Sequence, residues 1–148
     1  MDIMPRPTNT EVMDRLHAVM HGLRRHLQQA LRDDADGLGP MEARCLNYFA
    51  HHDGHTQSDL VQHAGRDKAQ IARLVKSLHE RGLLLSRPDP ADGRVLRVSP
   101  TPAGLALHRR LQQHRARFEK TLTAGLSAQE RATLLALLDR LEGNLPGG

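Results

Sequence analysis

Apolar residues recur at helical spacing in the first part of the chain. From Glu11 onward they are separated by three or four positions, which places them on one face of a helix for about five turns. They are Val12, Leu16, Val19, Leu23, Leu27 and Leu31. The pattern ends near residues 33–37, so it predicts a helix over 11–34. Residues 1–10 are rich in proline and polar side chains, and we expect them to form a mobile arm.

Three shorter helical patterns follow, each with its own start signal. Pro40 suits the first turn of a helix whose apolar positions include Cys45, Leu46, Phe49 and Ala50. Thr56 is a good N-cap, with Asp59 three residues on, and predicts a brief helix that ends at Ala64-Gly65. Asp67 is the next N-cap candidate. The helix from Lys68 carries apolar residues on one face and ends at Gly82; these residues are Ile71, Leu74, Val75 and Leu78.

The pattern then changes from helical to β-type and back. Residues 83–87 and 94–98 predict two strands of a hairpin around the turn 88–94. Thr101-Pro102 predicts the start of a long, mostly polar helix. Ser127 and Glu130 form the sequence signature of a capping box at the start of a strongly apolar last helix. Its apolar residues are Leu134, Leu135, Leu137, Leu138 and Leu141.

The order helix, helix, β-hairpin, helix is that of a winged helix-turn-helix. We therefore predict a mainly α fold with a small β-hairpin wing, built as a single domain over 11–148. Within it, 38–100 is expected to be the DNA-binding part, and 11–34 and 101–145 the dimerisation helices. The apolar faces of those flanking helices can be buried in two ways. They can pack on each other, or they can intertwine with a second copy as a C2 dimer. We expect the dimer, because helix-turn-helix proteins usually read paired half-sites.

The charge of the chain is concentrated on this module. Between Arg66 and Arg97 there are eight basic and four acidic residues, so the segment carries the whole formal net charge of +4. A basic excess on a candidate reading element is the electrostatic signature of a phosphate binder. We therefore predict double-stranded DNA as the partner.

Composition excludes several other classes of protein. With one cysteine there is no internal disulfide, which fits a reducing compartment. No apolar run is long enough for a membrane span, and the N-terminus lacks the apolar stretch of a secretory signal, so we expect a cytoplasmic protein without membrane association. The chain has no phosphate loop, no Gly-x-Ser-x-Gly and no His-Glu-x-x-His, and we expect neither catalysis nor a cofactor.

Several segments together resemble the MarR family of bacterial transcriptional regulators. They are residues 60–64, residues 68–83, Arg87, Asp92-Gly93-Arg94 and Thr101-Pro102-Ala103-Gly104. The wing signature of that family is Asp-x-Arg followed by Thr-x-x-Gly, and both parts occur here at fitting spacing. The resemblance spans about 11–145. It implies a dimeric winged helix-turn-helix, acting as a repressor or an activator, that is tuned by a small ligand, an oxidant or a metal.

The resemblance and the chemistry of the side chains together assign roles. By resemblance, Arg94 is the wing-tip arginine of the minor groove, and Asp92 is expected to hold its guanidinium. Lys68, Ala69, Gln70 and Arg73 are expected on the major-groove face, where glutamine can pair with adenine and arginine with guanine. The remaining candidates are phosphate contacts from Lys76, from the helix start Thr56-Gln57-Ser58, and from Arg87 and Arg97, which can contact either phosphate or bases.

The residues say less about the signal that would switch DNA binding on or off. By resemblance, a ligand pocket would be lined by residues such as Leu16, Met20, Phe49 and Leu105, which also suit a plain core. Cys45 suits core packing better than redox sensing, because peroxide-sensing members of the family carry their cysteine in the first helix. His17 and His21 have a chelating spacing but lack further ligands, so no metal site is predicted. The alternatives left open are a metal- or redox-switched regulator and a winged-helix interaction module that does not bind DNA.

Overall fold

The structure is a computed structural model that describes residues 4–34 and 37–147. Its contacts divide the chain into two compact units, Met1–Arg115 and Ala116–Gly148. The boundary falls within one helix, α5 (Pro102–Leu122). The first unit therefore contains the start of this helix together with all the elements before it.

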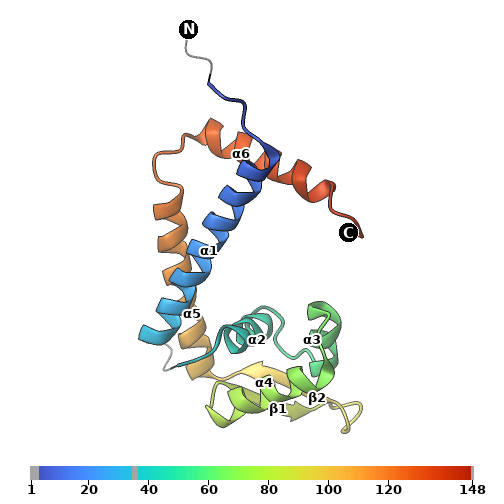
Figure 1. Ribbon diagram of the computed structural model, residues 1–148. Helices are drawn as coiled ribbons and strands as arrows, with labels where there is room; N and C mark the ends of the chain where they lie inside the picture. The colour runs from blue at the N-terminus through green and yellow to red at the C-terminus, as the bar shows by residue number, and fades with distance from the viewer. Residues whose placement is uncertain (1–3, 35–36, 148) are drawn as a thin grey trace. The chain divides into compact units, whose positions relative to one another are not determined.

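The first unit contains the helix, helix, hairpin order that the sequence predicts. Its elements are α1 (Asn9–Asp34), α2 (Pro40–His51), α3 (Gln57–Ala64), α4 (Lys68–Glu80), β1 (Leu84–Pro88) and β2 (Leu96–Pro100). Figure 1 shows α2, α3 and α4 gathered with the hairpin. The second unit contains the end of α5 and helix α6 (Ala128–Gly143). This arrangement of six helices and one antiparallel hairpin over the described residues confirms the fold class.

The core of the first unit is aliphatic, with a few aromatic rings. Leu46 and Phe49 of α2, Leu78 of α4 and Val98 of β2 have no exposed surface. Leu31, near the end of α1, also joins this cluster, so α1 is anchored to the core by its C-terminal end. The N-terminal half of α1 leaves its apolar side chains exposed; they include Val12, Met13, Val19 and Met20.

Helix α1 begins at Asn9, two residues earlier than predicted. The Oγ1 of Thr8 accepts a hydrogen bond from the Glu11 N–H at 3.1 Å, and Glu11 Oε2 accepts one from the Thr8 N–H at 3.0 Å. This is a reciprocal capping box, and its Thr-x-x-Glu signature was visible in the sequence. The mobile-arm prediction is therefore wrong for Asn9 and Thr10, and for residues 1–3 it lies outside the described residues.

The hairpin strands are displaced toward the C-terminus from the predicted 83–87 and 94–98. The N–H of Leu83 bonds to the Leu78 carbonyl at 2.9 Å, so Leu83 is held in the turn that follows α4. At the other side, the Val95 N–H bonds to the Asp92 carbonyl at 3.0 Å, which keeps Val95 in the turn. The register pairs Leu84 with Pro100 and Pro88 with Leu96. Local bonds at the two turns therefore decide the strand ends, and the alternating pattern could not reveal them.

Candidate nucleic-acid interface

The helix-turn-helix is shaped by side-chain caps that the sequence predicts. Thr56 Oγ1 accepts a hydrogen bond from the Asp59 N–H at 3.1 Å, and Asp59 returns one to the Thr56 N–H at 2.9 Å. Gly65 ends α3 in the left-handed region with φ +61°, a conformation that glycine adopts without a steric penalty. Asp67 then caps α4 through the Ala69 N–H at 3.3 Å. These contacts confirm the predicted caps and fix the turn between the two helices.

Helix α4 has one buried and one exposed face. Ile71, Val75 and Leu78 are buried against the core, whereas Lys68 and Arg73 are exposed. Ala69 and Lys76 are exposed as well, and Gln70 is half-buried beside them. Lys68, Arg73 and Lys76 have no ion-pair partner within the described part of the chain. The predicted reading residues therefore form a basic, solvent-facing surface, with Gln70 at its edge.

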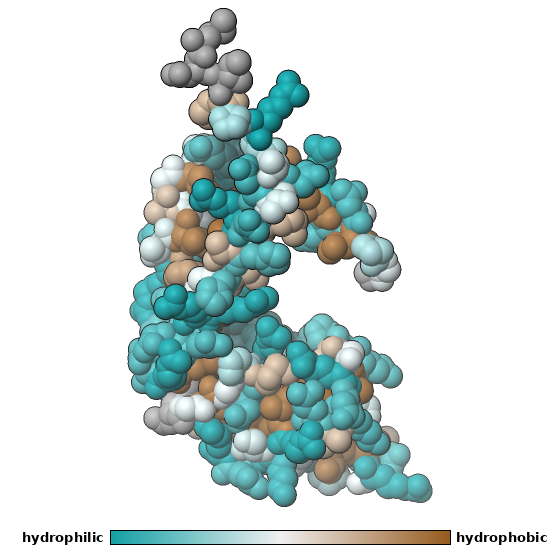
Figure 2. Space-filling model, in the orientation of Figure 1, coloured by the Kyte–Doolittle hydropathy of each residue, from teal (hydrophilic) through white to brown (hydrophobic). Residues whose placement is uncertain are grey.

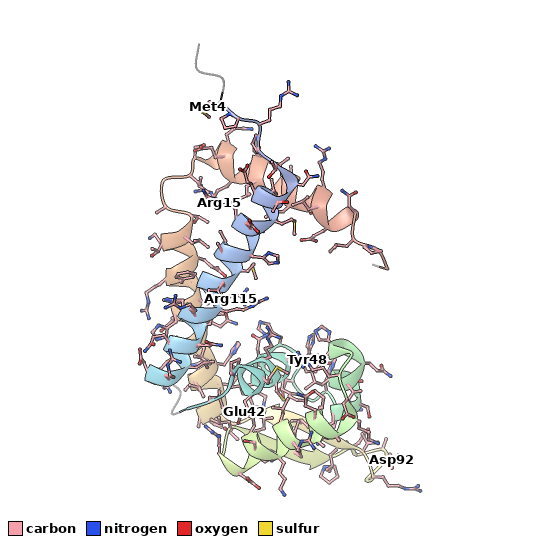
Figure 3. All side chains as sticks on the ribbon, in the orientation of Figure 1. Met4, Arg15, Glu42, Tyr48, Asp92 and Arg115 are labelled. Atoms are coloured by element: carbon pink, nitrogen blue, oxygen red, sulfur yellow. The ribbon has the colours of Figure 1, made fainter. Side chains whose placement is uncertain are left out.

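The end of α4 is tied to the start of α2. Glu42 Oε2 accepts a hydrogen bond from Ser77 Oγ at 2.7 Å and lies 3.5 Å from Arg81 Nε. The other oxygen of Glu42 accepts from the Gly39 N–H at 3.3 Å. This carboxylate of α2, labelled in Figure 3, thus fixes the direction of α4 relative to α2. Sequence reasoning missed Glu42, whose only signal was an acidic residue near the start of a helix.

The wing contains two aspartate caps and one ion pair. Asp89 Oδ1 accepts from the Ala91 N–H at 3.0 Å, and Asp92 Oδ1 accepts from the Arg94 N–H at 3.1 Å. Arg97 reaches Asp89 Oδ2 at 3.0 Å and the Gly54 carbonyl at 3.2 Å. The bond from the Ala91 N–H, and next the Arg97 guanidinium, lower the pKa of the Asp89 carboxyl.

The structure corrects the predicted hydrogen-bond partner of Asp92. Its carboxylate bonds to the backbone N–H of Arg94 and not to the guanidinium, because a carboxylate two residues back closes a local turn more readily than it follows a long side chain. The Arg94 guanidinium is exposed and has no ion-pair partner in the described residues. Figure 3 places Asp92 at the outer end of the hairpin. Arg94 is therefore free for an external partner at the wing tip.

Arg87 and Arg97 face each other across the hairpin but differ in their contacts. They are a registered cross-strand pair, and two like charges at such positions repel. Arg97 turns to Asp89, whereas Arg87 is exposed without an ion-pair partner in the described chain. Of the two, Arg87 is the one available to a ligand in this structure, and Arg97 mainly braces the wing against the turn at Gly54.

The start of α3 offers fewer donors than the sequence suggested. The Thr56 N–H is already taken by Asp59, while Gln57 and Ser58 stand in the first turn, where N–H groups lack helical partners. The bond from the Thr56 N–H is also the main reason that the pKa of Asp59 is lowered. A phosphate at this end would therefore bind through Gln57 and Ser58, near the Asp59 charge.

The predicted ligand residues differ in their exposure. Phe49 has no exposed surface, Leu16 and Leu105 are half-buried, and Met20 is exposed. A cavity of about 690 Å³ opens elsewhere in the first unit, between α2, α3 and the start of α4, and none of these four residues lines it. Phe49 is a core residue in this structure, and the ligand role of the other three stays a prediction.

The described residues contain neither a candidate metal-binding cluster nor a candidate membrane-spanning helix. No group of three or more histidine, cysteine or acidic side chains in residues 4–34 and 37–147 could hold a metal ion. Burial, and secondly the charge of Glu42, raise the pKa of the Cys45 thiol to about 12. Within the same residues, none of the helices has the length and hydrophobicity that crossing a bilayer requires.

A winged helix-turn-helix with a basic, exposed reading helix and an unpaired arginine at the wing tip defines the class of DNA-binding transcriptional regulators. Comparisons with known proteins agree. The model of the MarR family matches residues 36–95. A putative transcriptional regulatory protein for the hcr operon of Thauera aromatica is 31% identical over 147 residues, covering 92% of this chain and 89% of that protein. This chain belongs to the MarR family of transcriptional regulators.

Two further relatives show the breadth of the similarity. The transcriptional repressor NicR of Pseudomonas putida is 30% identical over 90 residues, covering 61% of this chain and 57% of that protein. The S. aureus MepR F27L mutant, solved bound to an oligodeoxyribonucleotide, has a TM-score of 0.67 at 22% identity, over 93% of this chain and 98% of that one. The similarity to the MepR variant shows a shared fold.

Proposed function

We propose that this chain binds a pseudo-palindromic operator in double-stranded DNA as a homodimer and represses transcription. The observation that carries this proposal is the division of the basic side chains into paired and unpaired groups. Arg81 and Arg97 are used internally, with Glu42 and Asp89 as partners. Among the lysines and arginines from Lys68 to Arg97, those without an ion-pair partner in the described residues stand on the exposed side of α4 and on the wing; they are Lys68, Arg73, Lys76, Arg87 and Arg94.

The unpaired cations suit the two grooves of DNA in different ways. Arg73 and Gln70 on α4 carry the side-chain chemistry that reads guanine and adenine in the major groove. Arg94 at the wing tip suits a narrow minor groove, whose negative potential attracts an arginine. Arg87 and Lys76 complete the surface with phosphate contacts. The DNA complex of the MepR variant and the repressor name of NicR support DNA binding and repression by similarity.

The second unit supports the homodimer. Every residue of α6 is exposed or half-buried, although the helix is rich in leucine. Leu134, Leu137 and Leu141 share one helix face and are 45%, 49% and 42% exposed. Figure 2 shows brown apolar side chains at the surface of this helix. An apolar face of this extent is a protein interface. A symmetric dimer would place two reading helices about 34 Å apart, which is one turn of DNA.

The remaining assignments follow from the regulatory role. The relatives are regulators, and we infer that this chain has no catalytic activity of its own. A regulator of bacterial operons acts where the chromosome is, which is the cytoplasm. A small-molecule effector is the expected switch.

The test is binding of the full chain to duplex DNA over a salt series, measured by fluorescence anisotropy. We expect log Kd to rise linearly with log salt, with a slope that reflects the number of phosphates contacted. A duplex that contains the DNA upstream of the protein's own gene should compete better than a scrambled duplex of equal base composition. Affinity without a salt slope, or no affinity at all, would instead favour an interaction module that does not bind DNA.

A further inference from the structure

The reading helix α4 is joined to strand β1 by one polar contact. The Nε2 atom of His79, in the last turn of α4, lies 2.7 Å from the Oγ of Ser86 on β1, and both residues are half-buried. The imidazole nitrogen can accept the hydroxyl proton or donate its own to the hydroxyl oxygen. In the part of the chain that the structure describes, no other side-chain hydrogen bond connects α4 with the hairpin, which Figure 1 shows beside it.

Ser86 occupies an inward-facing position of the hairpin. Side chains alternate between the two faces of a strand, so Ser86 shares its face with Leu84, which is buried. The register pairs Ser86 with Val98, which has no exposed surface. An aliphatic side chain would fill such a position without needing a polar partner. What the hydroxyl adds is direction, because a hydrogen bond fixes both the distance and the angle between its two partners.

The other strand of the wing is held by contacts that do not involve α4. The Val98 N–H bonds to the His55 carbonyl at 2.9 Å, and the Val98 carbonyl accepts from the Gly54 N–H at 2.9 Å. Arg97 adds its bond to the Gly54 carbonyl at 3.2 Å. These bonds tie β2 to the loop before α3. The wing is therefore linked to α4 by the bond at Ser86 and by apolar packing, which has no directional preference.

From these contacts we propose that His79 and Ser86 are a positioning pair for DNA recognition. The pair fixes the offset between α4 and the wing, so that Arg73 and Arg94 reach their two grooves at the same time. Arg73 precedes His79 on α4, and Arg94 follows Ser86 at the wing tip, so the bond lies between the two contact points. The inference rests on the proposed function, because it concerns how the residues assigned to DNA are presented.

The variant Ser86→Val separates positioning from stability. Valine is apolar and β-branched, which suits an inward-facing strand position, but it cannot bond to His79. The half-buried imidazole can turn to water instead, so we expect the urea midpoint to stay equal or to rise. DNA affinity, measured by fluorescence anisotropy, should nevertheless fall about threefold to tenfold, which is the size of one hydrogen bond. Unchanged DNA affinity at unchanged stability would overturn the proposal.

Three further variants serve as controls. Ser86→Thr keeps the hydroxyl and should bind DNA like the wild type. Ser99→Val makes the same change at a half-buried serine of β2 that has no side-chain hydrogen bond in the described residues, and it should leave DNA affinity intact. His79→Leu removes the other partner and should match Ser86→Val, while the double variant should lose no more than either single one. Fully additive losses, or an equal loss in Ser99→Val, would contradict a specific pair.

The contribution of Arg94 is the measurement that a purely structural role would not change. Arg94→Ala is compared in the wild-type and the Ser86→Val backgrounds. A displaced wing tip has less to lose, so we expect the factor lost to be at least about threefold smaller in the second background. The preference for A·T-rich flanks should shrink as well, whereas the effect of Gln70→Ala should be the same in both. Equal effects of Arg94→Ala in the two backgrounds would rule out a positioning role.

Hydrogen–deuterium exchange tests the pair without DNA and separates the two proposals. The amides of residues 88–95 should exchange faster in Ser86→Val than in the wild type or Ser99→Val, because the hairpin has lost its directional link to α4. If the wild type binds no DNA, the proposed function fails, and this exchange measurement still decides whether the pair holds the wing. If the wild type binds DNA with a salt slope and Ser86→Val binds and exchanges like it, the positioning pair is wrong and the proposed function is unaffected.

Discussion

Gly104 of α5 lies directly against the carbonyl oxygen of Leu83, so closely that a Cβ at position 104 would overlap that oxygen. The same carbonyl accepts the Thr101 N–H at 3.0 Å, and Thr101 Oγ1 donates to the Gly82 carbonyl at 2.6 Å while accepting from the Gly104 N–H at 3.1 Å. The Thr-x-x-Gly sequence is therefore a joint that holds the start of α5 against the turn between α4 and β1.

This joint predicts that Gly104→Ala destabilises the first unit. The overlap involves backbone atoms, which cannot rotate away, so we expect a loss of about 1–3 kcal/mol in the free energy of unfolding. Gly22→Ala is the control, because Gly22 lies within α1 with no atom near an added Cβ. That change should be neutral or stabilising by about 0.5–1 kcal/mol. Urea titration of both variants decides, and equal midpoints would contradict the role of the joint.

Arg94→Ala is predicted to weaken DNA binding without loss of stability. Its guanidinium is exposed and unpaired in the described structure, so removing it costs no internal contact. We expect lower affinity for all duplexes, a preferential loss at A·T-rich flanks, and a salt slope reduced by about one. Arg97→Ala instead removes the contacts to Asp89 and Gly54 and should loosen the wing. Gln70→Ala should mainly relax sequence preference. An unchanged affinity for Arg94→Ala would refute the wing assignment.

The capping carboxylate of Asp59 predicts acid sensitivity of α3. Its pKa is lowered from 3.8, mainly by the hydrogen bond from the Thr56 N–H. A pKa that is lower in the folded than in the unfolded chain adds stability above 3.8, and this stability is lost as the pH falls through the lowered value. Asp59→Asn should reduce stability near neutral pH by about 0.3–1 kcal/mol, and the difference should vanish toward pH ~2.

The measurement is the urea midpoint of both proteins at several pH values. Asp53→Asn serves as the control, because Asp53 is exposed in the preceding loop and caps no helix. A constant difference between wild type and Asp59→Asn at all pH values would mean that the charge of the cap contributes nothing.

Cys45 is predicted to be inert in the folded protein. The thiol is 2% exposed, and with a pKa of about 12 it forms almost no thiolate near neutral pH. We expect no reaction with a thiol reagent at pH ~8 until urea unfolds the chain, and peroxide should leave DNA affinity unchanged in wild type and in Cys45→Ser alike. Peroxide inhibition that Cys45→Ser resists would instead establish a redox switch.

The exposed leucines of α6 predict a dimer, and two charged side chains introduced on this face should disrupt it. Leu137→Glu combined with Leu141→Glu places carboxylates in the exposed apolar face. We expect sedimentation velocity to report a monomer and DNA affinity to fall, because paired half-site binding is lost. Gln129→Glu, at the exposed start of the same helix, should leave the dimer intact. A double variant that still sediments as a dimer would place the interface elsewhere.

Much of the local structure could be predicted from the residues alone. The caps at Thr56, Asp67 and Ser127 are confirmed because each depends on a hydrogen bond to a backbone N–H no more than three residues away. The same reasoning would have found Thr8, whose capping box was overlooked. The partner of Asp92 was predicted wrongly, since the choice between an N–H and a guanidinium depends on turn geometry that the sequence does not state.

The sequence by itself determined the order of the elements, the helix starts, the basic character of the reading segment and the family. Short-range hydrogen bonds, amphipathic periodicity and net charge are properties of neighbours along the chain. Only the tertiary structure decided that Asp89 holds Arg97 and leaves Arg94 free, that Glu42 bridges α2 to α4, and that Arg44, Tyr48 and Arg66 surround one cavity. Those relations join side chains from separate elements, and the packing of those elements sets which groups come within reach of each other.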